Sequence, residues 1–295
     1  MIEEPALHSS SIRIARTVAD LRATVAVWRS TGKTIALVPT MGALHEGHLS
    51  LVQLARSKAS RVVVSIFVNP AQFGPTEDFS RYPRDEAGDL AKLAPASHSP
   101  DTVDLVWAPS PDEMYPSGFA TRIAPQGAAL GLEGAVRPHH FVGVATVCCK
   151  LFGQVTPDFA IFGEKDYQQL CVIRQLVRDL NLRVEIVGAP TLREADGLAL
   201  SSRNAYLLLE ERKIAPALHR AIRSVAARIA KGSAPAEVTP GAAAEVIRAG
   251  FASVDYLEVR DAQTLAAFDP RSARPARVLA AARIGKTRLI DNVAV

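Results

Sequence analysis

Short runs of apolar residues recur through the first two thirds of the chain and have the length of buried strands. They cover residues 35–38, 62–68, 103–107, 159–162 and 183–187. Most are rich in β-branched and aliphatic residues, a pattern typical of strands covered on both faces of a parallel sheet. A further run, at residues 119–123, is predicted to form an edge strand.

Helices are expected between these runs. The spacing of apolar residues predicts them at residues 18–29, from 44 onward, at 85–93, at 141–152 and from 165 onward. Strands that alternate with helices form right-handed βαβ units, whose ligands lie beyond the carboxyl ends of the strands. The first part of the chain is therefore predicted to be an α/β, Rossmann-like domain with a parallel sheet, spanning residues 1–189.

The pattern changes after Pro190, where the polar residues 193–197 indicate a hinge. Helices are predicted at residues 207–231, with a kink or restart at Pro216, and at 240–251. Strands are predicted at residues 254–259, 277–282 and 287–292. Residues 190–295 are therefore expected to form a smaller α+β domain. Residues 1–16 are interpreted as a polar lead-in, and residues 95–100 as a solvent-exposed insertion.

The composition supports a two-domain globular protein and adds few constraints on function. The chain has 295 residues, a net charge of +4 and a hydrophobic content of 48%. This small positive charge permits anionic ligands but does not require a nucleic acid. Three cysteines without a C-x-x-C pair indicate neither a disulfide framework nor a zinc site. Without a signal peptide or an apolar run of about 18 residues, we expect a cytoplasmic protein with no membrane partner.

The stretch around His45 and His48 carries the strongest chemical signal. A buried strand is followed by the turn residues Pro39, Thr40 and Gly42 and then by the start of a helix. Free N–H groups and the helix dipole at such a site favour phosphate. Two histidines three positions apart share one helix face and can carry a proton near neutral pH. Surface histidines or a metal-binding pair are the alternative interpretation.

Other candidate residues lie after strands or at helix starts. Gln72, in the long polar loop 69–84, offers an amide to a small polar substrate or caps a turn. Lys165 can neutralise a phosphate, whereas Asp166 can be a helix cap, and Gln169 shares its helix face with Asp166. Ser201, Ser202 and Arg203 can hold a triphosphate through several donors, or cap the helix that follows.

Six blocks in the same order strengthen these interpretations. They are Pro39-Thr-Met-Gly-Ala-Leu-His-Glu-Gly-His48, Val68-Asn-Pro-Ala-Gln-Phe-Gly74, Tyr82-Pro-Arg84, His140-Phe-Val-Gly-Val-Ala-Thr-Val147, Phe162-Gly-Glu-Lys-Asp-Tyr-Gln-Gln169 and Ser201-Ser-Arg-Asn204. The first block resembles the HIGH-type signature of the nucleotidyltransferase superfamily. Together, over residues 12–293, the six resemble the pantothenate synthetase family.

The resemblance implies an ATP-dependent ligase that condenses (R)-pantoate with β-alanine through an enzyme-bound pantoyl adenylate, releasing AMP and pyrophosphate. It implies catalytic roles for His48 as proton donor, His45, Lys165 and Arg203. The implied ATP site comprises Met41, Gly42, Ala43, Leu44, His45, Glu46, Gly47, His48, Gly163, Glu164, Lys165, Asp166, Leu192, Leu200, Ser201, Ser202 and Arg203. Gln72 would bind pantoate and β-alanine, Gln169 pantoate, and Asp89 magnesium; the enzyme would be a homodimer.

Two departures and two alternatives remain open at this stage. Leu200 replaces a methionine of similar volume, and Gly88 stands beside Asp89 where relatives often carry an acid, which weakens the magnesium assignment. The nearest alternative is another HIGH-type nucleotidyltransferase that moves AMP onto a phosphate acceptor. The other is a nucleic-acid binder that uses the arginine-rich residues 212–231. Gln72 and Gln169 favour a hydroxy acid over a phosphate acceptor, since a phosphate would attract arginine or lysine.

Overall fold

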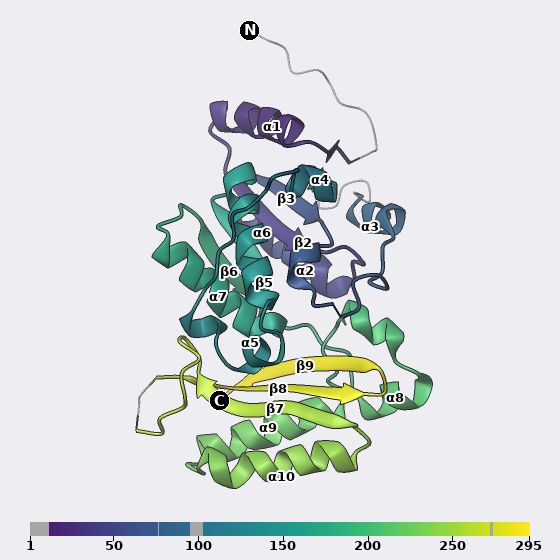
Figure 1. Cartoon of the computed structure of the whole chain (residues 1–295), viewed down its shortest axis with the longest axis vertical. Coiled ribbons are helices and arrows are strands. Elements are labelled where there is room, and N and C mark those ends of the chain that lie inside the picture. The colour runs from purple at the N-terminus through teal and green to yellow at the C-terminus, as the bar shows by residue number, and fades with distance from the viewer. Residues whose placement is uncertain (1–11, 76, 95–102, 272–273) are drawn as a thin grey trace.

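Six parallel strands form the sheet of the first domain (Figure 1). The structure, a computed structural model, describes residues 12–75, 77–94, 103–271 and 274–295. The strands are β1 (Ile14–Ala15), β2 (Ile35–Thr40), β3 (Arg61–Ile66), β4 (Leu105–Trp107), β5 (Phe159–Gly163) and β6 (Glu185–Ala189). They lie in the order β1-β4-β3-β2-β5-β6, and every neighbouring pair is parallel. The predicted Rossmann-like sheet is confirmed.

The strand order reverses direction at β2. On one side of β2 the sheet continues through β3 and β4, and on the other through β5 and β6. Open α/β sheets hold ligands in the crevice beyond the carboxyl ends of the strands at such a point. The carboxyl ends here are Thr40 and Gly163. Residues 41–48 and 163–166, both predicted to bind ATP, therefore start side by side.

Helices cover both faces of the parallel sheet. They are α1 (Val18–Ser30), α2 (Glu46–Lys58), α3 (Glu86–Leu93), α4 (Pro111–Met114), α5 (Leu132–Val136), α6 (His140–Val155) and α7 (Tyr167–Asp179). One buried cluster joins α1, α6 and α7 to the sheet through residues such as Leu21, Phe141 and Ile173. A second joins α2 and α3 to the sheet through Leu51 and Leu93. Burial on both faces explains the near-continuous apolar runs of the strands.

The second domain is an antiparallel sheet packed on helices. Its strands are β7 (Ser253–Asp261), β8 (Ala276–Ile284) and β9 (Thr287–Ala294), in that order. Its helices are α8 (Leu209–Ile214), α9 (Ala217–Ala230) and α10 (Pro235–Arg248). The sheet lies between the first domain and the helices α9 and α10 (Figure 1). β6 ends at Ala189, the last residue of the predicted first domain. The division into 1–189 and 190–295 stays a prediction.

Some local predictions were wrong, and each error has a physical reason. Residues 119–123 form no strand within the described chain, and Phe119 is 36% exposed. The polar lead-in contains the two-residue strand β1, which is too short to show a pattern and depends on pairing with β4. The short helix α5 was not predicted, because it lies in a glycine-rich stretch without a helical pattern.

The helices of the second domain follow their predictions more closely. The break expected at Pro216 is confirmed, because it separates α8 from α9. α10 begins at Pro235, five residues earlier than predicted, with proline in the favoured first helical position. The insertion predicted at residues 95–100 lies outside the described residues. Among the residues that the structure describes, no helix is long and apolar enough to cross a membrane.

Candidate active site

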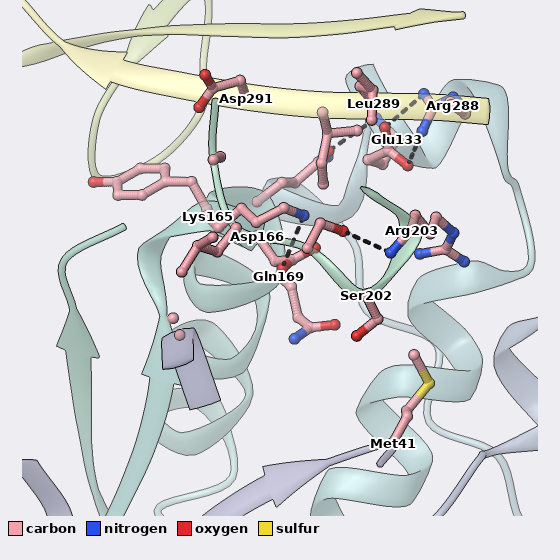
Figure 2. Close-up of a pocket in the computed structure, with 18 of the residues that line it drawn as sticks. Met41, Glu133, Lys165, Asp166, Gln169, Ser202, Arg203, Arg288, Leu289 and Asp291 are labelled. Carbon is pink, nitrogen blue, oxygen red and sulfur yellow. Dashed lines mark hydrogen bonds and ion pairs between the residues drawn. The ribbon is translucent and has the colours of Figure 1, made fainter. Parts of the chain in front are cut away.

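A cavity of about 530 Å³ lies between the two domains. It opens at the carboxyl ends of β2 and β5, and residues of β9 and of the segment before α8 line its other side. Of the predicted site residues, the cavity is lined by Met41, His45, Gly47, His48, Gln72, Gly163, Lys165, Asp166, Gln169, Leu192, Leu200, Ser201, Ser202 and Arg203. The two domains therefore bring together most of the residues expected from distant parts of the sequence (Figure 2).

Six predicted site residues are not part of the cavity lining: Gly42, Ala43, Leu44, Glu46, Glu164 and Asp89. The first three form the turn between β2 and α2. Gly42 has φ +79° and Ala43 has φ +50°, so this turn uses the left-handed region, which is costly for alanine.

Asp89 holds this turn in place. The carboxylate is buried, and its two oxygens accept hydrogen bonds from the backbone N–H groups of Ala43 (2.8 Å) and Leu44 (2.7 Å). Lys92, three residues further on α3, donates from Nζ to the carbonyl of Leu44 at 2.7 Å. Three hydrogen bonds from one helix thus stabilise a strained loop.

This geometry does not form a metal site by itself. Each oxygen of Asp89 already accepts one backbone hydrogen bond. Among the residues that the structure describes, no three His, Cys, Asp or Glu side chains group in a way that could hold a metal ion. The magnesium assignment of Asp89 therefore stays a prediction, and its contacts give it a structural role at the loop.

His45 and His48 lie side by side at the start of α2, with ring centroids 4.2 Å apart. His45 is the N-cap rather than part of the first helical turn, and its Nδ1 accepts a hydrogen bond from the N–H of Gly47 at 3.1 Å. The Nδ1 of His48 accepts from the N–H of His45 at 3.3 Å. Because each Nδ1 is an acceptor, the proton of each neutral ring is on Nε2, which is left to donate to a ligand.

Burial keeps both imidazoles neutral at neutral pH. It lowers the pKa of His45 to about 4, with a further contribution from the Lys165 ammonium group. Burial, together with His45, lowers the pKa of His48 to about 3. The positive charge that the sequence suggested near neutral pH is therefore absent in this structure, and the histidines are neutral hydrogen-bond donors.

The segment after β5 places Lys165, Asp166 and Gln169 at the cavity (Figure 2). The Lys165 ammonium lies 3.8 Å from the carboxylate of Asp166. Asp166 occupies the N-cap position of α7, but its side chain makes no capping hydrogen bond. From the second domain, Asn292 donates to the carbonyls of Glu164 and Lys165, both at 2.9 Å. The second domain thus helps to hold the backbone that carries Lys165 at the strand end.

Gln72 lies in a short 3-10 helix (Pro70–Gln72) and is 9% exposed. Its side-chain oxygen accepts from Asn69 at 3.0 Å, and its Nε2 donates to the Sδ of Met41 at 3.1 Å. Its carbonyl accepts from Nη2 of Arg137 at 3.3 Å and from Nδ1 of His140 at 3.1 Å. Side chain and backbone are both held, so the amide faces the cavity in one orientation.

The segment around Arg203 joins the second domain to the first. The hydroxyl of Ser201 accepts from the N–H of Arg203, so the predicted capping role is confirmed for Ser201. Ser202 Oγ donates to the carbonyl of Ala43 at 3.0 Å. Arg203 makes two hydrogen bonds of 3.0 Å to Asp78 of the first domain. The guanidinium predicted to bind phosphate is therefore paired with a carboxylate in this structure.

Several residues at the cavity were not predicted from the sequence. Asp78, Glu133, Arg137, Arg288 and Asn292 all line it. His140 and Tyr82 also line it, and both stand within blocks of the family resemblance. The others lack such a signal, because their importance comes from contacts between distant segments. Leu192 lines the cavity as predicted, and its carbonyl accepts a hydrogen bond from the N–H of Leu200.

Comparison with known proteins gives a consistent result. The family model described as pantoate-β-alanine ligase matches residues 13–294. Pantothenate synthetase of Paramagnetospirillum magneticum is 56% identical over 97% of this chain and 99% of that protein. Pantothenate synthetase 2 of Bradyrhizobium diazoefficiens is 57% identical over 97% of this chain and 100% of its own.

Solved structures agree over nearly the whole length. The crystal structure of pantothenate synthetase from Thermus thermophilus has a TM-score of 0.86 at 49% identity, covering 96% of this chain and 99% of that chain. The pantoate-β-alanine ligase of Francisella tularensis, crystallised with β-γ ATP and β-alanine, has a TM-score of 0.78 at 34% identity, covering 96% and 98%. The chain therefore belongs to the pantoate–β-alanine ligase family.

Proposed function

We propose that the cavity condenses (R)-pantoate with β-alanine, using ATP, in two steps that pass through an enzyme-bound pantoyl adenylate. AMP and pyrophosphate are the other products, and the pantothenate formed is the precursor of coenzyme A. The observation that carries the proposal is that imidazole, ammonium and guanidinium groups, which suit phosphate, line one cavity together with the neutral amides of Gln72 and Gln169. The family match over nearly the full length supports it.

In the first step the carboxylate of pantoate attacks the α-phosphate of ATP. A carboxylate-to-phosphorus bond forms, and the bond from phosphorus to pyrophosphate breaks. Negative charge grows on the α-phosphate and the leaving group. The Nε2–H groups of His45 and His48 and the ammonium of Lys165 stabilise this charge, because preorganised donors act strongly in a partly dry site.

His48 therefore acts as a hydrogen-bond donor to the phosphates rather than as an imidazolium acid. Its pKa of about 3 leaves the ring neutral before ATP binds. Bound phosphate would raise that pKa through its negative charge. Arg203 would exchange its carboxylate partner Asp78 for the triphosphate when ATP binds.

In the second step the amine of β-alanine attacks the acyl carbon of the adenylate. The amide C–N bond forms, the C–O bond to AMP breaks, and the attacking nitrogen gives up one proton to solvent. We assign Gln72 and Gln169 to the hydroxyl and carboxylate groups of pantoate, and Gln72 also to β-alanine. Neutral amides can hydrogen-bond both donors and acceptors of a hydroxy acid. The adenine and ribose would lie near Leu192 and Asp166.

Magnesium is proposed as the ion that accompanies the triphosphate. Mg²⁺ in ATP sites is held mainly by phosphates and water, with one or two carboxylates, so it needs no dedicated protein cage. Asp89 is the predicted ligand, although its two oxygens accept backbone hydrogen bonds. The ion would share the charge of the phosphates, and the steps above are derived from the protein's own side chains.

A homodimer and a cytoplasmic location are also proposed. Phe119 is 36% exposed and contacts Tyr115, with ring centroids 5.1 Å apart, and the exposed residues 119–122 form no strand within the described chain. A second copy of the chain could cover this exposed segment. A native mass equal to the 31.6 kDa of one chain would contradict the dimer. Fractionation of cells would test the location.

The reaction is tested by leaving out each substrate in turn. The full mixture of ATP, magnesium, pantoate and β-alanine should release AMP and form pantothenate in equal amounts. ATP–pyrophosphate exchange should require pantoate but not β-alanine, because adenylation comes first. Exchange that does not need pantoate, or the formation of a dinucleotide product, would contradict the proposal.

Two near-isosteric variants of His48 separate its two hydrogen bonds. His48→Asn keeps an acceptor for the N–H of His45 but loses the Nε2–H donor, so pantoate-dependent exchange should fall about 10²–10³-fold. His48→Gln keeps a donor near the Nε2 position and should lose less activity. His139→Ala is the control, since this histidine is exposed, lies outside the cavity lining and makes no capping hydrogen bond with its side chain. Equal rates for His48→Asn and wild type would contradict the assignment.

A further inference from the structure

A buried ion pair joins the two domains at one end of the cavity. Arg288 of β9 donates to both oxygens of Glu133 on α5, from Nη1 at 2.9 Å and from Nη2 at 2.6 Å (Figure 2). The two side chains are only 14% and 8% exposed. Tyr256 of β7 adds a hydrogen bond to Glu133 at 2.8 Å, and Nε of Arg288 is held by Asp255 at 2.6 Å.

Glu133 belongs to a part of the first domain that cannot shift easily. Its N–H donates to Oε1 of Gln168 on α7 at 2.9 Å. Next to it, a Cβ at Gly134 would lie 1.8 Å from the carbonyl oxygen of Ala129, so α5 is packed as closely as a glycine allows. The carboxylate is thus a fixed point for the second domain.

Electrostatics favour the ionised pair. Burial alone would raise the pKa of Glu133, but the hydrogen bonds and the charge of Arg288 outweigh burial, so the pKa lies below its usual value. Bidentate arginine–carboxylate pairs require one relative orientation of the two groups. A buried pair that is pulled apart by a small amount leaves two charges poorly solvated. The pair therefore favours one closed arrangement and penalises partial opening.

The same carboxylate is connected to the proposed substrate site. Nη1 of Arg137 lies 3.6 Å from Oε2 of Glu133, and its Nη2 donates to the carbonyl of Gln72 at 3.3 Å. Arg137 is also held by Glu77, whose Oε1 accepts from Nε at 2.9 Å. A continuous set of charged contacts therefore runs from β9 of the second domain to the backbone of Gln72.

We propose that Glu133 is a positioning residue that latches the second domain closed through Arg288 and, through Arg137, fixes Gln72 only while the cavity is closed. This inference rests on the proposed two-step reaction. The pantoyl adenylate is an activated ester that water can hydrolyse, so it must stay enclosed until β-alanine attacks it. When pantoate is saturating, a displaced Gln72 no longer limits pantoate binding, and the latch then acts on the retention of the intermediate and on the amine step rather than on the rate of adenylation.

Glu133→Gln tests the latch, because the amide keeps the shape but carries no charge. The measured quantity is the ratio of AMP released to pantothenate formed, at saturating ATP and pantoate and with limiting β-alanine. The wild-type ratio should be close to one. In Glu133→Gln it should rise several-fold, with a higher KM for β-alanine and with pantoate-dependent ATP–pyrophosphate exchange retained.

Further variants guard against a folding defect. Arg288→Lys keeps the charge but loses the bidentate contact, and should raise the ratio of AMP to pantothenate less than Glu133→Gln does. Tyr256→Phe should have the smallest effect on this ratio. Glu86→Gln is the control, since it weakens an exposed Arg16–Glu86 pair within the first domain. Its ratio should stay close to one. The circular dichroism and melting of each variant show whether it is folded.

Two results would overturn the latch. One is an unchanged ratio and KM in folded Glu133→Gln and Arg288→Lys. The other is loss of exchange in a folded variant, which would place Glu133 in the adenylation step. Failure of the proposed function is distinct, because it would abolish pantoate-dependent exchange in the wild type.

Discussion

Backbone N–H groups fix the orientation of the side chains around the loop between β2 and α2. Both oxygens of Asp89 and the Nδ1 atoms of His45 and His48 accept hydrogen bonds from the turn at Ala43–Leu44 and from the start of α2. These contacts determine the tautomer of each histidine and the path of the loop. Changing one acceptor therefore affects the direction of several donors at once.

Asp89→Asn should weaken the binding of ATP. An amide has one acceptor oxygen, so the N–H of either Ala43 or Leu44 loses its partner in a buried site. We expect the KM for ATP to rise at saturating magnesium, whereas the magnesium concentration for half-maximal rate stays unchanged. Adding Ala43→Gly, which relaxes the left-handed residue, should recover part of the loss.

The measurement is steady-state kinetics with ATP and magnesium varied independently. A raised magnesium requirement, with full activity restored at high magnesium, would instead establish Asp89 as a metal ligand. Lys92→Met is a useful comparison, since it removes the hydrogen bond to the carbonyl of Leu44 without removing a carboxylate.

The sequence predicted single residues well where a strand end or a helix start carries the signal. His45, His48, Lys165 and Gln169 reach the cavity as expected. The charge states of His45 and His48 were not predictable, because their pKa values depend on burial by segments far away in the chain. The roles of Glu133 and Asp78 were equally hidden, since each depends on an arginine more than 100 positions away.

At the scale of elements, a close contact between α6 and the 3-10 helix Pro70–Gln72 sets the position of Gln72. A Cβ added at Gly143 would lie 2.2 Å from the carbonyl oxygen of Ala71 and 2.6 Å from Cα of Gln72. Asn69 also donates to the carbonyl of Gly143 at 3.2 Å. The two elements can approach this closely only because residue 143 has no side chain.

We therefore predict that Gly143→Ala displaces Gln72 and impairs substrate binding. The KM values for pantoate and β-alanine should rise at least tenfold, and stability should fall, because the obstacle is backbone rather than a flexible side chain. Gly153→Ala in the same helix is the matched control: nothing lies within 4 Å of its Cβ. It should leave kinetics unchanged and stabilise α6 by about 0.5–1 kcal/mol. Similar kinetics for the two variants would contradict the prediction.

Element prediction from sequence succeeded where burial on both faces imposes a long apolar run. β2, β3, β5, α3 and α6 were predicted to within a few residues, and so was the start of α2. It failed for β1 and α5, which contain two and five residues and owe their conformation to tertiary contacts. At Phe119–Ile123 the composition is that of a strand, but a strand requires a paired neighbour.

On the scale of the whole molecule, the two domains meet through polar contacts as well as through apolar packing. Arg277 pairs with Glu164 at 3.0 Å, and Tyr167 donates to the carbonyl of Ala262 at 2.9 Å. These contacts, with the pair formed by Arg203 and Asp78, come from segments whose proximity no local pattern predicts. The alternation of elements predicted two domains, whereas the position of the second domain over the cavity required the structure.

Because it contains buried neutral histidines, the protein should become less stable as the pH falls. Burial lowers the pKa of His140 to about 4, with a contribution from Arg137, whereas an unfolded histidine has a pKa near 6.5. Between these values the unfolded chain binds the extra proton, so the free energy of unfolding falls as the pH decreases from about 6.5 to 4. The stabilisation is fully present above pH 6.5.

His140→Asn should remove one such proton, since its amide nitrogen lies near the position of Nδ1 and can still donate to the carbonyl of Gln72 but cannot titrate. We expect the slope of unfolding free energy against pH to decrease by at most about 1.4 kcal/mol per pH unit, with the largest decrease near pH 5, about midway between the two pKa values. Denaturant unfolding of the ligand-free chain at a series of pH values measures it. Identical slopes for the variant and the wild type would contradict the prediction.

The contact between Gln72 and Met41 exposes the reaction to oxidative damage. The thioether that accepts the amide hydrogen lies at the cavity, whereas Met114 is fully buried. Conversion of Met41 to its sulfoxide would exchange a weak sulfur acceptor for a bulkier, strongly polar oxygen beside the amide. Peroxide would thus impair substrate recognition before it affects the core, a bound substrate would shield the sulfur, and methionine sulfoxide reductase would restore the enzyme.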